Sequence, residues 1–241
     1  MLLLLLLLLM ASVAINLVAY RIAKKNYVAV KAASVFPSNA HQFQDQNKLL
    51  AQKTNTRIVL FGDSRIAQWQ SFPKAGSFEV VGRGIEGETS QQLRARFDAD
   101  VIDLQPDIVV LQLGINDLTA IGVMPDRQAD IVRQCVNNIR YMVDTLLSRG
   151  IRTILLTIVP PYRPSLLRLP IWSRDIEAQT LALNAELLHL PASPLLHVID
   201  TQSILQDKTG RWRDDVNADT LHLTRTGYNY LNAAVVPLLR D

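Results

Sequence analysis

Apolar and polar residues divide this chain into a hydrophobic start and a longer part in which two patterns alternate. Residues 1–20 contain no charged side chain and include eight consecutive leucines. From Arg57 onward, short apolar runs alternate with stretches whose apolar residues recur at helical spacing. Such runs, rich in β-branched residues, are typical of strands that are buried on both faces. We predict strands at residues 57–61, 78–81, 107–113, 151–159 and 195–199.

The segments between these strands predict helices. The clearest covers residues 126–149, where one apolar stripe repeats at helical spacing, with Asp126 to cap its start and Gly150 to end it. Weaker patterns predict helices at residues 89–104, 174–190 and 225–239. This alternation predicts an α/β fold with a parallel sheet and helices on both of its faces.

The first twenty residues are long enough to cross a membrane as a helix, because twenty residues span about 30 Å. A cleaved signal peptide is the alternative, but basic residues usually precede its apolar run and none does here. We therefore favour a single-pass N-terminal membrane anchor. It is followed by a basic flank of Arg21, Lys24, Lys25 and Lys31.

The rest of the chain can lie on either side of that membrane. The positive-inside rule places the basic flank, and the domain behind it, in the cytoplasm. An uncleaved signal anchor would place the domain outside the cytoplasm. Residues 21–56 are polar and mixed, and we interpret them as a tether with some helix at residues 45–53. Residues 57–241 then form one folded domain.

Composition excludes several classes of protein. With 49% apolar and 20% charged residues in a chain of 241, the sequence is typical of a globular domain. The net charge of +3 is mild, and no dense Lys/Arg block or stacking platform indicates nucleic-acid binding. The single cysteine, Cys135, excludes an intrachain disulfide and a zinc site built on several cysteines. Cys135 lies on the apolar stripe of the clearest predicted helix, so we expect it to be a core residue. We expect the protein to use no metal and no cofactor.

Polar residues follow several of the predicted strands. Ser64 comes directly after the first, Gly87 lies in a glycine-rich turn after the second, and Asn116 follows the third. Asp219 and His222 come after the fifth, near the end of the chain. In a parallel sheet these loops lie at one edge, so these residues can meet there.

The residue types are those that acyl transfer requires. A serine hydroxyl becomes a nucleophile when a base takes its proton, and His222 is the candidate base for Ser64. Asp219 can hold the imidazole in one tautomer, while Asp214 and Asp215 are more distant alternatives. The backbone N–H groups of Ser64 and Gly87, with the Asn116 amide, can form an oxyanion hole. We interpret Asp63 and Asp117 as structural residues of the loops.

These residues resemble the SGNH hydrolases, also called GDSL esterases and lipases. The blocks of that family occur in order as Gly62-Asp63-Ser64, Gly87, Gly114-x-Asn116-Asp117 and Asp219-x-x-His222. The resemblance covers residues 57–241 and implies a flavodoxin-like three-layer fold. It also implies ester hydrolysis without a metal, with Ser64, His222 and Asp219 as catalytic triad. An α/β-hydrolase is a poorer match, because Ile66 stands where its nucleophile motif has a second glycine.

The sequence leaves the substrate open. We expect a short acyl ester on a small molecule, lipid or sugar. Arg65 and Gly82 depart from the usual family pattern. We predict that Arg65 and Arg83 add positive charge at the mouth of the site. The proline-rich segment 160–172 is expected either to be a packed loop or to form a partly apolar wall, with Arg163 and Arg168 facing an anionic group or a membrane.

Two other functions remain open at this stage. One is a membrane-tethered binding or assembly module that keeps the fold without turnover. The other is a thioesterase or peptidase that uses the same triad on a different leaving group.

Overall fold

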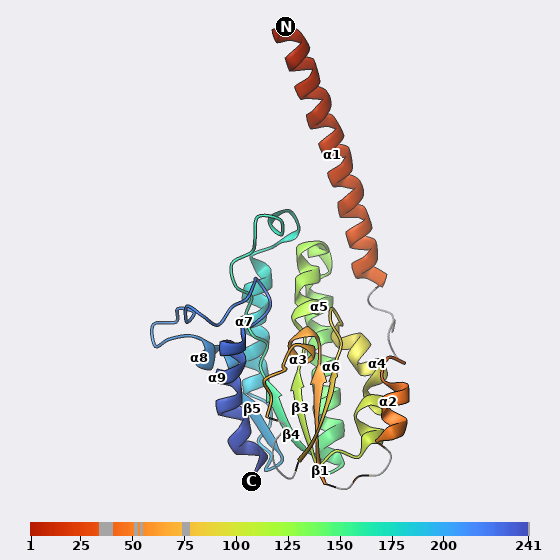
Figure 1. Ribbon diagram of the computed structural model, residues 1–241, viewed down its shortest axis with the longest axis vertical. Helices are drawn as coiled ribbons and strands as arrows, with labels where there is room; N and C mark the ends of the chain where they lie inside the picture. Colours follow the sequence, from red (N-terminus) through yellow and green to blue (C-terminus); the bar gives the residue numbers. More distant parts are fainter. Residues whose placement is uncertain (34–40, 51–52, 54, 74–77, 241) are drawn as a thin grey trace.

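Five parallel strands form the centre of the protein in this computed structural model (Figure 1). The structure describes residues 1–33, 41–50, 53, 55–73 and 78–240. The strands lie in the order β2-β1-β3-β4-β5. Their bounds are β1 Thr56–Gly62, β2 Phe78–Gly84, β3 Ile108–Gln112, β4 Arg152–Leu156 and β5 Leu196–Ile199.

The strands are apolar on both faces because each face packs against helices. In β1, Val59 and Phe61 point to one core cluster, whereas Ile58 and Leu60 point to the other. Their side chains are at most 4% exposed. Successive side chains of a strand point to opposite faces of the sheet, so a single apolar run contributes residues to both hydrophobic cores.

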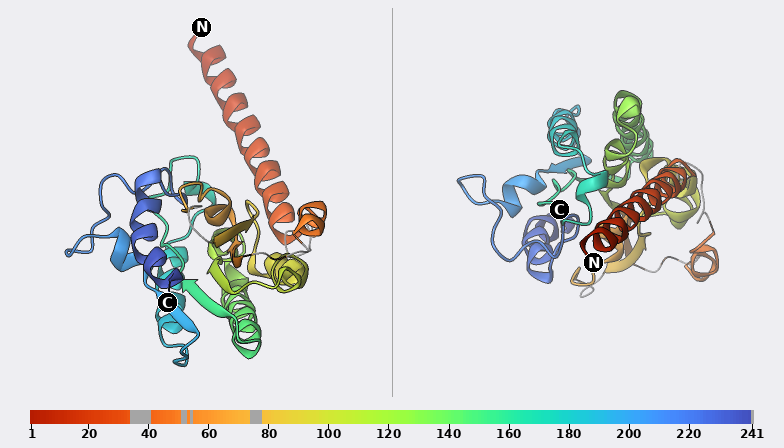
Figure 2. Two further views of the ribbon diagram at one scale, coloured as in Figure 1. Left: turned by 60° about the horizontal axis from the view of Figure 1, so that its bottom comes forward. Right: turned by 90° about the horizontal axis from the view of Figure 1, so that it is seen from above.

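Helices cover the two faces of the sheet as separate layers (Figures 1 and 2). One layer packs on the cluster that contains Val59 and consists of α4 Ser90–Asp100, α6 Gln128–Ser148 and α7 Asp175–Leu188. The other packs on the cluster that contains Ile58 and consists of α3 Ser64–Ala67, α8 Thr201–Leu205 and α9 Arg225–Val235. The predicted flavodoxin-like α/β/α fold with a five-stranded parallel sheet is confirmed.

The expected elements exist, but several of their ends differ. The strand predicted at 78–81 extends to Gly84, so the glycine-rich turn begins later than expected. The strand predicted at 151–159 ends at Leu156. Asp126 does not cap α6, which is preceded by a 3-10 turn at Pro125–Arg127 and has Arg127 at its N-cap. Gly150, with φ +72°, follows the end of α6 as predicted.

Three short helices were not predicted. These are α3, α5 Ile115–Thr119 and α8, each of which begins within a few residues of the carboxyl end of a strand. They contain four or five residues, which is too short for an apolar stripe to repeat along the sequence.

The N-terminal helix α1 covers Leu2–Ala33 and projects from the domain (Figure 1). Its segment Leu2–Val30 is long and apolar enough to cross a membrane, and none of the most apolar window is buried against the protein. A signal sequence meets the same criterion of length and composition. The helix continues well into the segment predicted as a tether.

A second part of the predicted tether packs on the domain. Helix α2 covers Gln44–Leu49, and Asn47 donates hydrogen bonds to the Ala99 carbonyl at 2.9 Å and to the Asp100 carboxylate at 2.8 Å. Residues 34–40 of the predicted tether lie outside the described residues.

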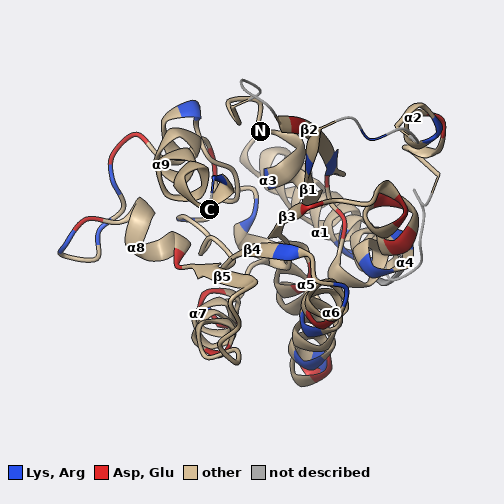
Figure 3. Cartoon of the chain, turned by 90° about the horizontal axis from the view of Figure 1, so that it is seen from below, with Lys and Arg blue, Asp and Glu red and all other residues tan. Residues whose placement is uncertain are grey.

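Charged side chains lie mainly on the outer helices α4 and α6 and on the loop between α8 and α9 (Figure 3). Both signs are interspersed there, and no extended basic face is visible in this view. This distribution agrees with the small net charge of +3.

Candidate active site

The predicted site residues follow the carboxyl ends of the strands. Ser64 is the first residue of α3, directly after β1, and Asp63 caps this helix by accepting a hydrogen bond from the Arg65 backbone N–H at 3.0 Å. Ser64 is only 6% exposed, because α3 turns back over the end of the sheet. The short strand-to-helix connection therefore fixes the direction of its hydroxyl.

His222 lies between Ser64 and Asp219. The distance from His222 Nε2 to Ser64 Oγ is 3.1 Å, and that from His222 Nδ1 to Asp219 Oδ2 is 2.8 Å. Both are within hydrogen-bond range. The structure thus pairs His222 with Asp219, and not with Asp214 or Asp215.

A tight turn positions Asp219 and His222 together. Ala218 N–H donates to the His222 carbonyl at 2.9 Å, and the Leu221 and His222 N–H groups donate to Asp219 Oδ1 at 2.7 and 2.9 Å. One Asp219 oxygen is therefore used to hold the turn, and the other contacts the imidazole.

These hydrogen bonds determine the ionisation of Asp219. Partial burial opposes the charged form, but the bonds from the His222 ring and from the two backbone N–H groups outweigh it and lower the pKa of Asp219 to about 2. The carboxylate is therefore available to orient His222 throughout the neutral and mildly acidic range.

Ser64 and His222 line an open pocket of about 660 Å³. Gly87, with φ +78°, and Asn116 line the same pocket, so the structure brings together the residues predicted for the triad and for the oxyanion hole. Asn116 is 7% exposed, and its amide donates to the Glu88 carbonyl at 3.0 Å. Since a side-chain amide carries two N–H bonds, this contact leaves a second one for a ligand.

Comparisons with known proteins show the family to which the chain belongs. Residues 38–230 match the model of the GDSL-like Lipase/Acylhydrolase family. The chain belongs to this family. The sequence analysis placed the start of the domain at Arg57. The family match begins earlier, at residue 38, and it includes α2.

Two curated relatives match parts of this family member. The uncharacterized lipoprotein YqeF of Bacillus subtilis (strain 168) is 28% identical over 120 residues, which are 43% of this chain and 48% of that protein. An acetylxylan esterase of Geobacillus stearothermophilus is 45% identical over 47 residues, which are 20% of this chain and 21% of that enzyme. The chain thus spans about half of one relative and about a fifth of the other.

A solved structure has the same fold. The GDSL-like lipase of Bacteroides thetaiotaomicron VPI-5482 superposes with a TM-score of 0.69 at 24% identity, over 84% of this chain and 97% of that one. This likeness supports the assignment of the fold.

Two buried groups of polar residues support the pocket of this GDSL-family protein and were missed from the sequence. In the first, Arg96 Nε donates to Glu88 at 2.7 Å and its Nη1 to Asp100 at 2.9 Å, with both acidic side chains 2% exposed. Arg96 also donates to the carbonyls of Gly62 and Arg83. It therefore links α4 to the ends of β1 and β2. The i, i+4 spacing of Arg96 and Asp100 was the available sequence signal.

The second group joins α4 to α5. Asp117 accepts hydrogen bonds from the Ser90 N–H at 2.8 Å and from the Ser90 hydroxyl at 2.6 Å. Burial raises the pKa of Asp117 to about 6, although the bonds from Ser90 partly oppose this. The expected structural role of Asp117 agrees with these contacts, which hold the start of α5 near Asn116.

Arg83 does not lie at the mouth of the pocket, and the prediction that it contributes charge there is wrong. Its side chain is 3% exposed, stacks at 4.6 Å on the Phe43 ring and donates to the Asn47 side chain at 2.6 and 2.9 Å. The strand extends to Gly84, so Arg83 points to α2 and not into a turn. It joins the N-terminal segment to the sheet.

Arg65 is also buried, and the same prediction is wrong for it. The residue is 1% exposed, and its Nε donates to the Leu221 carbonyl at 2.9 Å, next to His222. Tyr228 donates from its hydroxyl to the Arg65 carbonyl at 2.8 Å. Arg65 therefore packs beneath the turn that carries His222 and is screened from a ligand in the pocket.

The segment 160–172 contacts the same turn and forms part of the pocket wall. Thr220 accepts a hydrogen bond from the Ser165 N–H at 3.3 Å and donates to the Arg163 carbonyl at 3.2 Å. Leu167, Arg168 and Ile171 of this segment line the pocket with Ser64. Tyr27 of α1 lines the pocket as well, although no motif in the sequence predicts this.

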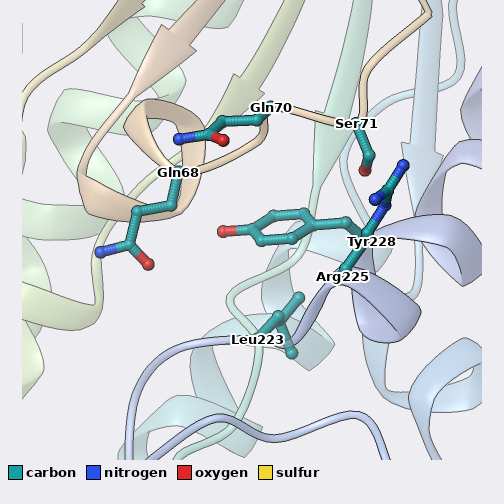
Figure 4. A pocket seen from close by; sticks show the side chains of 6 residues that line it. All are labelled: Gln68, Gln70, Ser71, Leu223, Arg225 and Tyr228. Atoms are coloured by element: carbon teal, nitrogen blue, oxygen red, sulfur yellow. The ribbon is translucent and has the colours of Figure 1, made fainter.

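A second hollow of about 410 Å³ lies between the residues that follow α3 and the start of α9 (Figure 4). The Tyr228 ring extends between Gln68 and Gln70 on one side and Leu223 on the other. None of the predicted site residues lines this hollow. Among the described residues, no three His, Cys, Asp or Glu side chains are grouped so that they could hold a metal ion.

Proposed function

We propose that this protein is a membrane-anchored serine esterase with Ser64, His222 and Asp219 as its catalytic triad. The observation that carries the proposal is the continuous hydrogen-bonded series from Ser64 Oγ through His222 to Asp219, with distances of 3.1 and 2.8 Å. Membership of a lipase/acylhydrolase family supports the reaction class.

In the first half-reaction, Ser64 Oγ attacks the ester carbonyl while His222 Nε2 takes the hydroxyl proton. The Asp219 carboxylate keeps the imidazole in the tautomer with its proton on Nδ1 and stabilises the imidazolium. Collapse of the tetrahedral intermediate breaks the ester C–O bond, and His222 returns the proton to the leaving alcohol. Water, activated by His222, then attacks the acyl-enzyme and releases the acid.

The negative oxygen of each tetrahedral intermediate needs preorganised donors. We assign the Ser64 and Gly87 backbone N–H groups and the free Asn116 amide N–H to this role, because all three residues line the pocket. One such donor typically lowers the barrier by roughly 3–4 kcal/mol.

The substrate is proposed to be a short acyl ester. The likeness of a 47-residue segment to an acetylxylan esterase favours a small acyl group. The pocket is open, and it has room for the alcohol portion of an ester to extend into solvent.

The anchor is proposed to be α1. Its apolar segment Leu2–Val30 has the length of a membrane span, and no other part of the described chain covers its most apolar window. An apolar helix of this length left in water would be costly, whereas a bilayer matches it.

A fluorophosphonate probe tests the enzyme directly, since it reacts with activated serine hydroxyls. We expect the wild-type protein to be labelled and Ser64→Ala to remain unlabelled. Ser165→Ala removes another hydroxyl from the same pocket and should still react, which makes it a matched control. Folded wild-type protein that does not react would favour a binding or assembly module that has no turnover.

A panel of substrates then defines the leaving group. Oxygen esters and thioesters of the same acyl group are compared, from acetyl to longer chains, with Ser64→Ala as the blank. We expect the highest kcat/KM for an acetyl oxygen ester. A higher value for the thioester would assign a thioesterase to the same site.

A further inference from the structure

We propose that the edge of the domain around the Ser64 pocket rests on the bilayer that holds α1, and that the ester is taken from an amphiphile in that bilayer. The inference rests on the proposed esterase and on the proposed anchor. The docking surface consists of residues 163–171 and the polar end of α1, and its partner is the lipid surface.

The sequence of α1 defines where the membrane boundary lies. Residues 1–20 carry no charge, whereas Arg21, Lys24 and Lys25 follow at once and are exposed. Tyrosine favours the boundary between hydrocarbon and water, and basic residues favour the headgroups. Tyr20 therefore marks the depth of the interface along the helix.

The loop of the pocket wall is at the same depth. Tyr20 donates a hydrogen bond from its hydroxyl to the Pro170 carbonyl at 3.3 Å. One end of the domain holds the carboxyl ends of the strands, the loop 160–172 and the side from which α1 projects (Figure 1). Seen from above, α1 passes beside this loop (Figure 2). The bilayer that surrounds α1 would therefore reach the loop.

The loop has the side chains that such a position requires. Leu166, Leu167 and Leu169 are 84%, 91% and 52% exposed, an unusual set of leucines for a surface in water. Arg163 and Arg168 are in the same loop. Apolar side chains with flanking arginines can insert at the interface while the guanidinium groups reach lipid phosphates.

The pocket opens close to this surface. Tyr27 lines it together with Ser64 and His222, and it follows Tyr20 by seven residues on α1. Seven helical residues correspond to about 10 Å, which places Tyr27 at the outer side of a headgroup layer roughly 5–8 Å thick. An amphiphile that rises slightly from this layer would therefore bring its ester to the pocket while its apolar chains stay in the bilayer.

A depth measurement tests the surface independently of catalysis. The full-length Leu166→Cys protein is labelled with bimane and reconstituted in vesicles of phosphatidylcholine and phosphatidylglycerol, with or without a doxyl-labelled lipid. The native Cys135 is 0% exposed, and burial raises the pKa of its thiol, so it should not react. The matched control is Leu188→Cys, a 43% exposed leucine at the opposite end of the domain.

We expect the doxyl lipid to quench bimane at position 166 at least twofold more than at position 188. Equal and weak quenching at both positions would overturn the proposal.

A second experiment tests the source of the substrate. Leu166→Asp/Leu169→Asp places two charges on the loop without changing a residue that lines the pocket. Hydrolysis of an acetyl ester of a diacylglycerol within the vesicles should fall about tenfold, whereas hydrolysis of soluble para-nitrophenyl acetate should stay unchanged. The control is Leu49→Asp/Leu188→Asp, which replaces two exposed leucines elsewhere.

The outcomes separate this proposal from the proposed function. Equal rates of the loop variant and wild type on the vesicle ester would overturn the membrane source and leave the esterase intact. A protein that is quenched at position 166 but hydrolyses neither ester would support the docking surface and contradict the esterase.

Discussion

At the scale of single residues, Asp219 combines exposure with a fixed orientation. Its side chain is 52% exposed, yet one oxygen is held by two backbone N–H groups and the other by His222. Its position depends on a local turn and needs little support from the core. A substitution here should therefore change the chemistry and leave the fold intact.

The first prediction concerns Asp219→Asn. The amide cannot fix the same tautomer of His222, so kcat/KM should fall about 10²–10⁴-fold. Because the pKa of Asp219 is about 2, its carboxylate is ionised in the wild type at all pH values above about 4, so from pH 7 to 9 the comparison is between a charged carboxylate and a neutral amide. Ester hydrolysis across this range is the measurement. Asp214→Asn, the more distant alternative, serves as control, and an equal loss there would contradict the assignment.

The second prediction concerns Arg65→Met, which keeps the length of the side chain and removes its charge. The hydrogen bond to the Leu221 carbonyl is lost, and the buried Asp63 carboxyl loses the charge that opposes the burial-induced rise of its pKa. We expect the free energy of unfolding to fall by about 1–3 kcal/mol, as for a buried hydrogen-bond acceptor that loses its donor. Thermal unfolding and kcat both report the change.

The same variant decides whether Arg65 meets the substrate. We expect the ratio of anionic to neutral ester hydrolysis to stay unchanged, since Arg65 is 1% exposed. Arg163→Met, at an exposed position of the pocket loop, is the comparison. A selective loss of anionic esters in Arg65→Met, with unchanged stability, would restore the role at the mouth.

At the scale of elements, the site is held where α4 and α5 begin. Ser90 at the start of α4 binds Asp117 of α5, and Arg96 joins α4 to the loop that contains Glu88. Neither helix carries a side chain of the proposed triad. Their contacts set the positions of Asn116 and Gly87.

The third prediction uses the ionisation of Asp117. Its pKa is about 6 in the folded protein, against an ordinary value of 3.8 for an aspartate in the unfolded chain, so the folded state holds the proton more tightly than the unfolded state. The resulting stability is fully present below pH 3.8 and is lost as the pH rises through 6. Asp117→Asn does not titrate and serves as the reference. Relative to it, the free energy of unfolding of the wild type should fall by roughly 3 kcal/mol between pH 4 and 7. Thermal unfolding in detergent at a series of pH values measures this difference, and parallel curves would contradict it.

The predicted elements and the missed ones differ in length. The strand at 57–61 and the helix at 126–149 were recognisable because burial imposes a period along several residues. The helix α5 has only five residues, and all five are buried, so its sequence shows no periodic contrast. It begins after Gly114, whose φ of +113° allows the chain to leave β3 and turn.

At the scale of the whole molecule, α1 is both the proposed membrane span and a part of the pocket wall. Tyr20 contacts the pocket loop and Tyr27 lines the pocket, so the helix that would span the bilayer is also part of the wall. Removal of α1 as a signal peptide would open this side of the pocket.

The fourth prediction distinguishes the anchor from a signal peptide. We expect the protein in cells to stay in the membrane pellet after alkaline carbonate, to dissolve in detergent, and to retain a peptide from residues 1–20 in mass spectrometry. Leu8→Arg/Ala11→Arg should reduce the membrane fraction, because each arginine near the centre of a span costs about 2.5–3.5 kcal/mol. A soluble wild-type protein without that peptide would favour cleavage.

The sequence alone was enough to predict the layers of the fold and the meeting of Ser64, Gly87, Asn116, Asp219 and His222 at one edge of the sheet. Burial leaves a periodic pattern in the sequence. In a parallel sheet, the loops that follow the strands lie at one edge, whichever side chains they carry. Tertiary structure decided the roles of Arg65, Arg83 and Tyr27. Each depends on a partner far along the chain, as Arg65 does on Leu221 and Arg83 on Asn47. The direction and the burial of such side chains depend on how the elements pack against one another. A local sequence pattern contains no information about this packing.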